Sequence, residues 1–301
     1  MPFKIKKIAV IGAGFMGVQI SSIAALAKYS VKVYDPNPDA PAKGLGELKG
    51  IYALKGITEQ EERLNSAQEK ILYCNSLSQA VTDADLIIEA VTENMDLKKK
   101  VFNQIDIAAP DHAIIASNSS SIPVVKFEDA VGRTDKVLNI HFDAPMIDLP
   151  LVDIMPGTNT SPETIEMAKL WVESIDCVPI VLKKPIMGYL ANRLWRMVKR
   201  ESLKLWAEGY GDFMDIDRSW MMQFKVELGP FAMMDAIGLD VIYDIEMAYY
   251  NETGDPFDKP PQALKEMIDR GDLGLKTGKG FYNWSDPEFL KPDFIKKKAK
   301  K

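Results

Sequence analysis

The sequence predicts an α/β fold in which a doubly wound, mostly parallel sheet is followed by an all-helical domain. Three observations predict this architecture. A glycine-rich turn separates a short apolar strand from a helical stretch near the start of the chain. Apolar runs and helical patterns then alternate as far as about residue 184, and no convincing strand follows Lys183–Pro185. We therefore expect two domains, residues 1–184 and 185–301.

The first element is a β-branched run at Lys7–Ile11, which is typical of a buried parallel strand. A helical stretch without Gly or Pro follows at Gln19–Lys28, and a second strand at Val31–Tyr34 ends at Asp35. The turn between the first strand and the helix has the spacing GxGxxG. Strand, glycine turn, helix, strand and acid in this order form the fingerprint of a dinucleotide-binding Rossmann unit.

Each residue type in the turn has a physical role. Gly12 allows the tight turn, Gly14 lets the backbone approach a pyrophosphate at the helix N-terminus, and Gly17 allows close packing. Phe15 and Met16 complete the turn. Asp35 can accept both ribose hydroxyls of NAD and would repel the 2′-phosphate of NADP, so NAD is the expected cofactor. A structural βαβ unit that binds nothing is the alternative.

The remaining elements follow the same alternation. Buried strands are predicted at Asp85–Val91, Ala113–Ala116, Val137–Ile140, Leu151–Met155 and Val178–Leu182. A helix is predicted at Asp96–Ala108, and Ser161 with Pro162 marks the start of another. Helices of the second domain are predicted over residues 188–208, 214–225, 229–250 and 261–270. Its many Met and Trp residues could form the core, a dimer interface or a hydrophobic substrate wall.

Composition excludes several classes of function. The chain is 47% apolar and 27% charged, as in ordinary globular proteins, and its net charge of −6 argues against a nucleic-acid partner. No signal-peptide core and no apolar stretch of about 18 residues is present, so no membrane partner is expected. Two cysteines, Cys74 and Cys177, suit a reducing compartment, and we expect a cytoplasmic protein. The basic run Lys296–Lys301 is expected to be a solvated tail.

The chain has only two histidines, and their positions differ in character. His112 is expected in a surface turn, whereas His141 follows the predicted strand Val137–Ile140, at the edge where open α/β sheets bind ligands. Imidazole can take a hydroxyl proton near neutral pH as a hydride leaves. Asp153 on the next strand is a candidate to orient the imidazole, while Asp143 is more consistent with a loop residue.

Two other polar positions could contribute to chemistry. Ser117–Ser121 follows another strand end, where hydroxyls could bond a substrate carbonyl oxygen, although a polar capping turn explains this run as well. Asn192 lies at the start of an apolar helix and could be a buried structural amide or could face a cleft. No metal site is expected.

Several ordered motifs together resemble the 3-hydroxyacyl-CoA dehydrogenase family over nearly the whole chain. These motifs are the glycine turn VIGAGFMG, Asp85–Asn94 (DLIIEAVTEN), Ala116–Ser121 (ASNSSS), Ile140–Phe142 (IHF), Gly229–Phe231 (GPF), Asp235–Asp240 (DAIGLD) and Lys276–Tyr282 (KTGKGFY). The resemblance implies a Rossmann domain followed by a helical dimerisation domain. It also implies a His–carboxylate pair, with a serine and an asparagine near the substrate oxygen.

Carried over by position, the catalytic residues implied by the resemblance are His141, Ser120 and Asn192, with Asp153 where the family has glutamate. Glu93 and Lys98 join the cofactor-binding residues implied by the same resemblance. Since Asp153 is one methylene shorter than glutamate, we expect either that the backbone closes in or that water bridges the pair.

Three segments depart from the family pattern. The family's HFFNP reads HFDAP at His141–Pro145, and Leu149–Asp153 is more similar to the lambda-crystallin/L-gulonate dehydrogenase and diketoreductase branches. The region after Asp35, which usually contacts the CoA nucleotide, is broken by glycines. Only Lys43 and Lys49 could meet phosphates there.

The expected function is NAD-dependent interconversion of a 3-hydroxyacyl-CoA and its 3-oxoacyl-CoA, with His141 as the base and a small-molecule substrate that is an acyl-CoA. The protein is expected to be a homodimer. One alternative is a dehydrogenase or reductase of a free 3-hydroxy acid, a sugar acid or a diketone. A second alternative is a non-catalytic, crystallin-like NAD(H)-binding protein.

Overall fold

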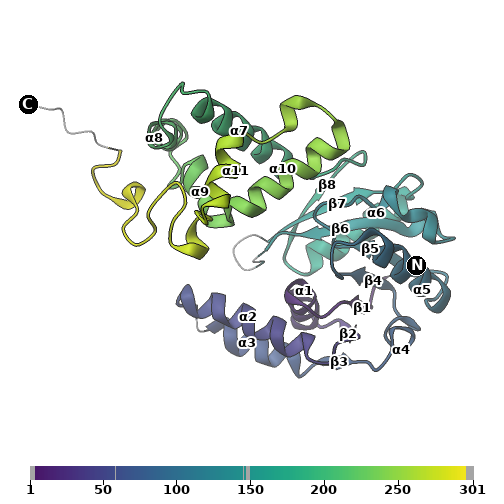
Figure 1. Ribbon diagram of the computed structural model, residues 1–301. Helices are drawn as coiled ribbons and strands as arrows, with labels where there is room; N and C mark the ends of the chain where they lie inside the picture. Colours follow the sequence, from purple (N-terminus) through teal and green to yellow (C-terminus); the bar gives the residue numbers. More distant parts are fainter. Residues whose placement is uncertain (1–3, 58, 145, 147–149, 296–301) are drawn as a thin grey trace, which may run out of the picture. The chain divides into compact units, whose positions relative to one another are not determined.

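The computed structural model describes residues 4–57, 59–144, 146 and 150–295, and it divides into two compact units after Leu190 (Figure 1). The change of sequence pattern at residue 184 lies a few residues before this division. The predicted tail Lys296–Lys301 lies outside the described residues, as do Pro145 and Leu149.

Within the described residues, the first unit contains an eight-stranded sheet in the order β3-β2-β1-β4-β5-β6-β7-β8. Its strands are β1 (Lys7–Ile11), β2 (Ser30–Tyr34), β3 (Ile71–Tyr73), β4 (Leu86–Glu89), β5 (Ile114–Ser117), β6 (Val137–Phe142), β7 (Leu151–Pro156) and β8 (Val178–Val181). Neighbouring strands are parallel except β6 and β7, which are antiparallel. This sheet and the helical second unit confirm the predicted fold class.

Helices cover both faces of the sheet, because alternate strand residues point to opposite sides. One set, including Val10, Ile88 and Ile140, packs with α1 (Phe15–Leu26) and α6 (Pro162–Ser174). The other set packs with α4 (Leu77–Val81) and α5 (Met95–Ala108). Short 3₁₀ turns occupy the β5–β6 connection at η1 (Val124–Lys126), η2 (Glu128–Ala130) and η3 (Thr134–Lys136). The hydroxyl of Ser161 caps α6, as predicted from Ser161 and Pro162.

The segment after Asp35 folds differently from its glycine-broken appearance in the sequence. It forms a continuous helix, α2 (Ala40–Leu54), which is followed by α3 (Glu59–Gln68). A Cβ at Gly44 would lie 2.8 Å from the carbonyl carbon of Gly14, so this glycine lets α2 pack against the glycine turn. Tertiary packing therefore outweighs the low helix propensity of glycine here.

The second unit is helical, with α7 (Ala191–Ala207), α8 (Phe213–Phe224), α9 (Pro230–Ile237), α10 (Leu239–Thr253) and α11 (Gln262–Asp269). The 3₁₀ turns η4 (Pro256–Asp258), η5 (Leu275–Thr277) and η6 (Glu288–Leu290) connect or follow these helices. The single helix predicted over 229–250 is wrong: Gly238 adopts φ 108°, which separates α9 from α10. Met221, Met234, Trp195 and Trp206 contribute to the core of this unit, whereas Met222 is exposed. Among the described residues, no helix combines the length and apolar character needed to cross a bilayer.

Asp217 on α8 organises this helical core. Its buried carboxylate accepts hydrogen bonds from the backbone N–H groups of Phe231 and Ala232, at 2.8 and 3.0 Å, and from the Tyr282 hydroxyl at 2.9 Å. Burial outweighs these hydrogen bonds and raises the pKa of Asp217 from 3.8 to about 6.

The raised pKa predicts a pH dependence of stability. Because the folded state favours protonated Asp217, this stabilising contribution is present below pH 3.8 and is lost as the pH rises through about 6. A pKa difference of this size corresponds to about 3 kcal/mol. We expect Asp217→Asn to remove this part of the pH dependence of the free energy of unfolding. Urea unfolding across this pH window measures it, with the exposed Asp244→Asn as control. Equal pH slopes for wild type and Asp217→Asn would contradict the expectation.

Candidate active site

The glycine turn has the geometry of a dinucleotide site. A Cβ at Gly12 would lie 2.5 Å from the carbonyl oxygen of Ala90, and one at Gly17 would lie 1.9 Å from the carbonyl oxygen of Gly12. A Cβ at Gly14, by contrast, would meet no atom within 4 Å. The fold itself therefore requires the first and third glycines, and the second leaves open space beside the first turn of α1. Helix α1 begins at Phe15 with Gly14 as its N-cap. The open space beside Gly14 therefore lies at the helix N-terminus, where backbone N–H groups can bind an anion.

Asp35 is fixed at the end of β2. Its two carboxylate oxygens accept hydrogen bonds from the backbone N–H groups of Ala13, at 2.7 Å, and Asn37, at 2.8 Å. The residue borders a hollow of about 550 Å³, whose other lining residues include Val33, Tyr34, Pro41, Tyr73 and Cys74. The carboxylate is thus held beside a space where ribose hydroxyls could donate to it. Together with the open space at Gly14, this arrangement fits NAD.

A buried ion-pair network lies beneath the serine run. The Lys98 ammonium is fully buried and lies 2.8 Å from Glu89 Oε1 and 3.3 Å from Glu93 Oε2. Glu89 also accepts a hydrogen bond from the Ser117 hydroxyl at 2.7 Å. Lys98 therefore holds two carboxylates together, and the assignment of Glu93 and Lys98 to cofactor binding stays a prediction.

Glu93 organises the loop that carries Ser120. It accepts hydrogen bonds from the Ser119 hydroxyl at 2.8 Å, from the Ser120 backbone N–H at 2.9 Å and from the Ser120 hydroxyl at 3.3 Å. Burial alone would raise the pKa of Glu93, but Lys98 and these hydrogen bonds outweigh it and lower the pKa. The ionised carboxylate therefore holds Ser120 at the carboxyl end of β5, where this residue is exposed.

Lys98→Met is expected to lower the free energy of unfolding by about 3 to 5 kcal/mol, because it leaves Glu89 buried without its cation. Urea unfolding measures the loss. Lys99→Met is a matched control, since its ammonium pairs with the exposed Asp129, and it should change stability by no more than about 0.5 kcal/mol. Adding Glu89→Gln to Lys98→Met should recover part of the loss, and failure to do so would contradict the ion-pair explanation.

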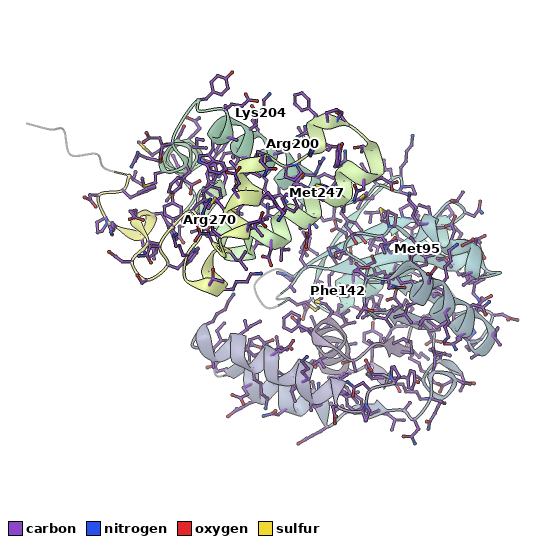
Figure 2. The ribbon with its side chains drawn as sticks, in the orientation of Figure 1. Met95, Phe142, Arg200, Lys204, Met247 and Arg270 are labelled. Carbon is purple, nitrogen blue, oxygen red and sulfur yellow. The ribbon has the colours of Figure 1, made fainter. Side chains whose placement is uncertain are left out.

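His141 and Asp153 form a direct pair. They are register partners on β6 and β7, and His141 Nδ1 lies 3.3 Å from Asp153 Oδ2. Asp153 is the third residue of β7 and therefore lies near the beginning of that strand. The antiparallel β6–β7 pairing brings the two side chains together, so the shorter aspartate reaches the imidazole without a bridging water. Figure 2 labels Phe142, the last residue of β6, next to His141 in sequence.

Tyr189 and Asp143, neither of which the sequence assigned to the site, lie next to the same imidazole. The Tyr189 ring stacks on it at 4.5 Å with an interplanar angle of 7°, and the Tyr189 hydroxyl donates to the backbone carbonyl of Ser119. Asp143 Oδ1 lies 3.9 Å from His141 Nε2. Gly188 and Tyr189 both have positive φ, at 80° and 48°. A glycine before an aromatic at a predicted helix start was the only sequence signal for Tyr189.

Asn192, Lys43 and Lys49 are the remaining predicted site residues. Asn192 is exposed in the first turn of α7, in the helical unit, so the buried-amide alternative is wrong and its catalytic role stays a prediction. Lys43 is exposed on α2, and the Lys49 ammonium lies 3.3 Å from Glu61 Oε1. Substrate binding by Lys43 and Lys49 also stays a prediction.

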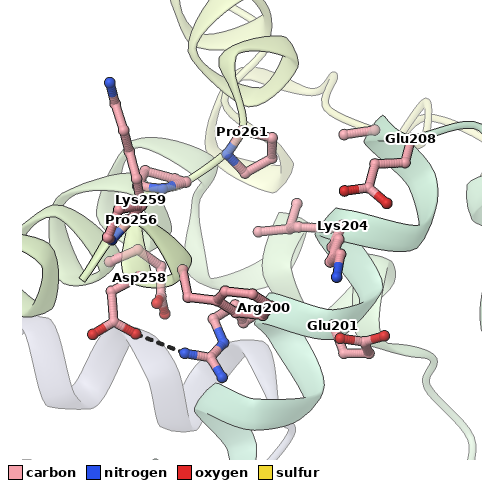
Figure 3. Close-up of a pocket in the computed structure, with 13 residues that line it drawn as sticks. Arg200, Glu201, Lys204, Glu208, Pro256, Asp258, Lys259 and Pro261 are labelled. Carbon is pink, nitrogen blue, oxygen red and sulfur yellow. Dashed lines mark hydrogen bonds and ion pairs between the residues drawn. The ribbon is translucent and has the colours of Figure 1, made fainter.

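The helical unit has a hollow of its own. It measures about 270 Å³ and lies between α7 and the 256–261 segment, where Arg200 forms an ion pair with Asp258 (Figure 3). None of the residues predicted from the sequence to bind or react lines it. The cluster around His141 is therefore the better candidate for chemistry.

Comparison with known proteins gives matches along most of the chain. The family model described as 3-hydroxyacyl-CoA dehydrogenase, NAD binding domain, matches residues 7–185, and the model for the C-terminal domain matches residues 188–284. A probable 3-hydroxybutyryl-CoA dehydrogenase of Bacillus subtilis is 32% identical over 286 residues, which cover 94% of this chain and 99% of the relative.

Solved structures agree with these matches. A diketoreductase that acts on dicarbonyl compounds has 33% identity and a TM-score of 0.82, and the match covers 93% of this chain and 99% of that one. An (S)-3-hydroxybutyryl-CoA dehydrogenase from Ralstonia eutropha has 31% identity and a TM-score of 0.81, with 94% and 100% coverage.

Proposed function

This chain belongs to the 3-hydroxyacyl-CoA dehydrogenase family and is an NAD-dependent oxidoreductase, and we propose on that premise that it interconverts a 3-hydroxyacyl-CoA and its 3-oxoacyl-CoA with His141 as the base. One observation carries the proposal: Asp153 engages His141 Nδ1 at 3.3 Å at the carboxyl end of the parallel strands. Nε2 then remains for the substrate hydroxyl.

The residues around the imidazole suit proton transfer. Asp153 favours the tautomer with hydrogen on Nδ1 and stabilises the imidazolium that forms when Nε2 takes the hydroxyl proton. Tyr189 covers one face of the ring and restricts its rotation. The Ser120 hydroxyl, which donates to Glu93 Oε1 at 3.3 Å, would turn its hydrogen to the substrate oxygen, and Asn192 is proposed as a second donor. Gly12, Gly14, Gly17 and Asp35 would hold NAD, which would supply the hydride acceptor in the oxidation direction.

A second candidate substrate class is a 3-hydroxy or 3-oxo compound without CoA. Two observations favour it: Lys49 already pairs with Glu61, and Gly44 packs against the glycine turn. Of the two lysines predicted to meet phosphates, Lys49 is therefore already paired, and Lys43 would remain for a CoA phosphate. The similarity to a diketoreductase points in the same direction.

Parallel assays with acetoacetyl-CoA and ethyl acetoacetate, followed by the loss of NADH absorbance, test the proposal. Efficient turnover of the thioester alone supports the acyl-CoA substrate. Turnover of the ester with a poor thioester rate supports the CoA-free class. Tight NADH binding without turnover of any 3-oxo compound would favour a non-catalytic, crystallin-like protein and contradict both.

We further propose that the protein acts as a cytoplasmic homodimer. The helical unit exposes large apolar side chains, among them Leu194, Met197, Met222, Phe224 and Ile237, which a second subunit could cover. Both cysteines are free and buried, which suits a reducing compartment. Sedimentation equilibrium tests the assembly, and a monomer at micromolar concentration would contradict it.

A further inference from the structure

Asp143 places a second carboxylate beside the imidazole, on the side opposite Asp153. In the described part of the chain, His141, Asp143 and Asp153 are the one set of three His, Cys, Asp or Glu side chains whose nitrogen and oxygen atoms lie within 4.8 Å of one another. Asp153 contacts Nδ1 at 3.3 Å, and Asp143 lies 3.9 Å from Nε2. The family motif HFFNP has a phenylalanine at the position of Asp143, so this carboxylate is a departure of the present chain.

Solvent access differs sharply within this set. The side chains of His141 and Asp153 are 5% and 3% exposed, whereas that of Asp143 is 25% exposed. A proton taken up at Nε2 therefore needs a route past the buried ring. Tyr189 covers one face of the ring and Asp153 occupies Nδ1. Among the described residues, Asp143 combines a carboxylate oxygen 3.9 Å from Nε2 with a side chain that reaches water.

Resting on the proposed function, we propose that Asp143 is the proton relay between His141 and solvent. In oxidation, the hydroxyl proton passes to Nε2 while the hydride leaves the carbinol carbon for NAD⁺. The same proton then passes from Nε2 to the Asp143 carboxylate and from there to water, which restores the neutral imidazole. Reduction uses the same route in reverse. Since 3.9 Å exceeds a hydrogen-bond length, one water or a small rotation of Asp143 completes the path.

The surroundings of Asp143 suit this role. Burial raises its pKa, the adjacent His141 lowers it, and the Asp153 carboxylate raises it again, with a net upward shift. A raised pKa brings the acid closer to the range of imidazole, which favours proton transfer in both directions. Burial, followed by the carboxylates of Asp153, Glu93 and Asp143, raises the pKa of Tyr189, so its hydroxyl stays protonated and does not compete for the proton.

Solvent exchange of the imidazole proton tests the relay without any substrate. The chain has only two histidines, so ¹⁵N-histidine labelling in a His112→Gln background reports on His141 alone. At a pH low enough to populate the imidazolium, which carries a proton on Nε2, we expect Asp143→Asn to slow solvent exchange of that proton at least tenfold. Asp129→Asn, a surface aspartate paired with Lys99, should leave the exchange rate unchanged. An exchange rate within twofold of the parent in Asp143→Asn would overturn the relay.

Turnover supplies the second readout. Asp143→Ala should lower kcat about tenfold in both directions, leave NADH affinity unchanged and recover when formate or acetate is added. A loss of kcat that small carboxylates do not rescue would overturn the relay and leave Asp143 a positioning residue. If the wild type turns over no 3-oxo compound, the proposed function fails, while the exchange experiment still decides whether Asp143 passes the proton.

Discussion

Replacing His141 with alanine is expected to lower turnover about 10²- to 10⁴-fold while NADH binding is retained. The imidazole is the group that removes the hydroxyl proton, and the residues of the proposed NAD site, from the glycine turn to Asp35, do not include it. Separate measurements of kcat and of NADH affinity by fluorescence titration check the two parts of this expectation.

His112→Ala is the matched control for this experiment. His112 is the chain's other histidine, is exposed and contacts Asp85 at 3.1 Å. It should retain turnover within about twofold of wild type, as expected of a surface substitution. Near-normal turnover in His141→Ala would eliminate His141 as the base. A loss of NADH binding in parallel with turnover would instead indicate that the sheet edge had been disturbed.

Asp153→Asn is expected to cause the next largest loss, again about 10²-fold or more. An amide at this position can turn its NH₂ group toward Nδ1, which favours the tautomer with hydrogen on Nε2 and so removes the base. The double variant His141→Ala/Asp153→Asn should be no slower than His141→Ala alone, because both residues act on one proton. Additive losses would contradict the pairing.

Asp153→Glu tests whether the pocket around His141 is fitted to aspartate or still suits the glutamate of the family. His141 and Asp153 are direct register partners with Nδ1 and Oδ2 already 3.3 Å apart. The strand pairing has closed the distance that a longer side chain would otherwise span. Both side chains are buried, so an added methylene must displace the ring or strain the strand. We expect Glu at this position to lower kcat, and an equal or higher kcat would show that the pocket still suits glutamate.

The fold was largely predictable because its signals are local. Gly12, Gly14 and Gly17 are separated by a few residues, and their conformational demands are visible in the spacing alone. The apolar runs that become β1, β4 and β5 are continuous because both faces of a parallel sheet are buried. The helix α2 could not be predicted from its glycine-rich segment, since the reason for Gly44 is a contact with Gly14, which lies thirty residues earlier in the chain.

The candidate site was only partly predictable, because its contacts, like that of Gly44 with Gly14, join residues far apart in the sequence. The residue types of His141, Asp153 and Ser120, and their positions relative to predicted strands, suggested the chemistry from the sequence alone. The sequence could not reveal that β7 runs antiparallel to β6, because apolar periodicity carries no strand direction. That direction alone decides which atoms of Asp153 and His141 meet.

By itself, the sequence determined the α/β class, the dinucleotide turn with Asp35 and the identity of the imidazole that could act as a base. Short-range spacing and residue chemistry are sufficient for such conclusions. Only the tertiary structure decided that Asp153 touches Nδ1, that Tyr189 stacks on the ring and that Asp143 lies beside Nε2. These contacts join residues 12 to 48 positions apart or depend on the direction of a side chain after a strand ends, and both follow from packing rather than from local sequence.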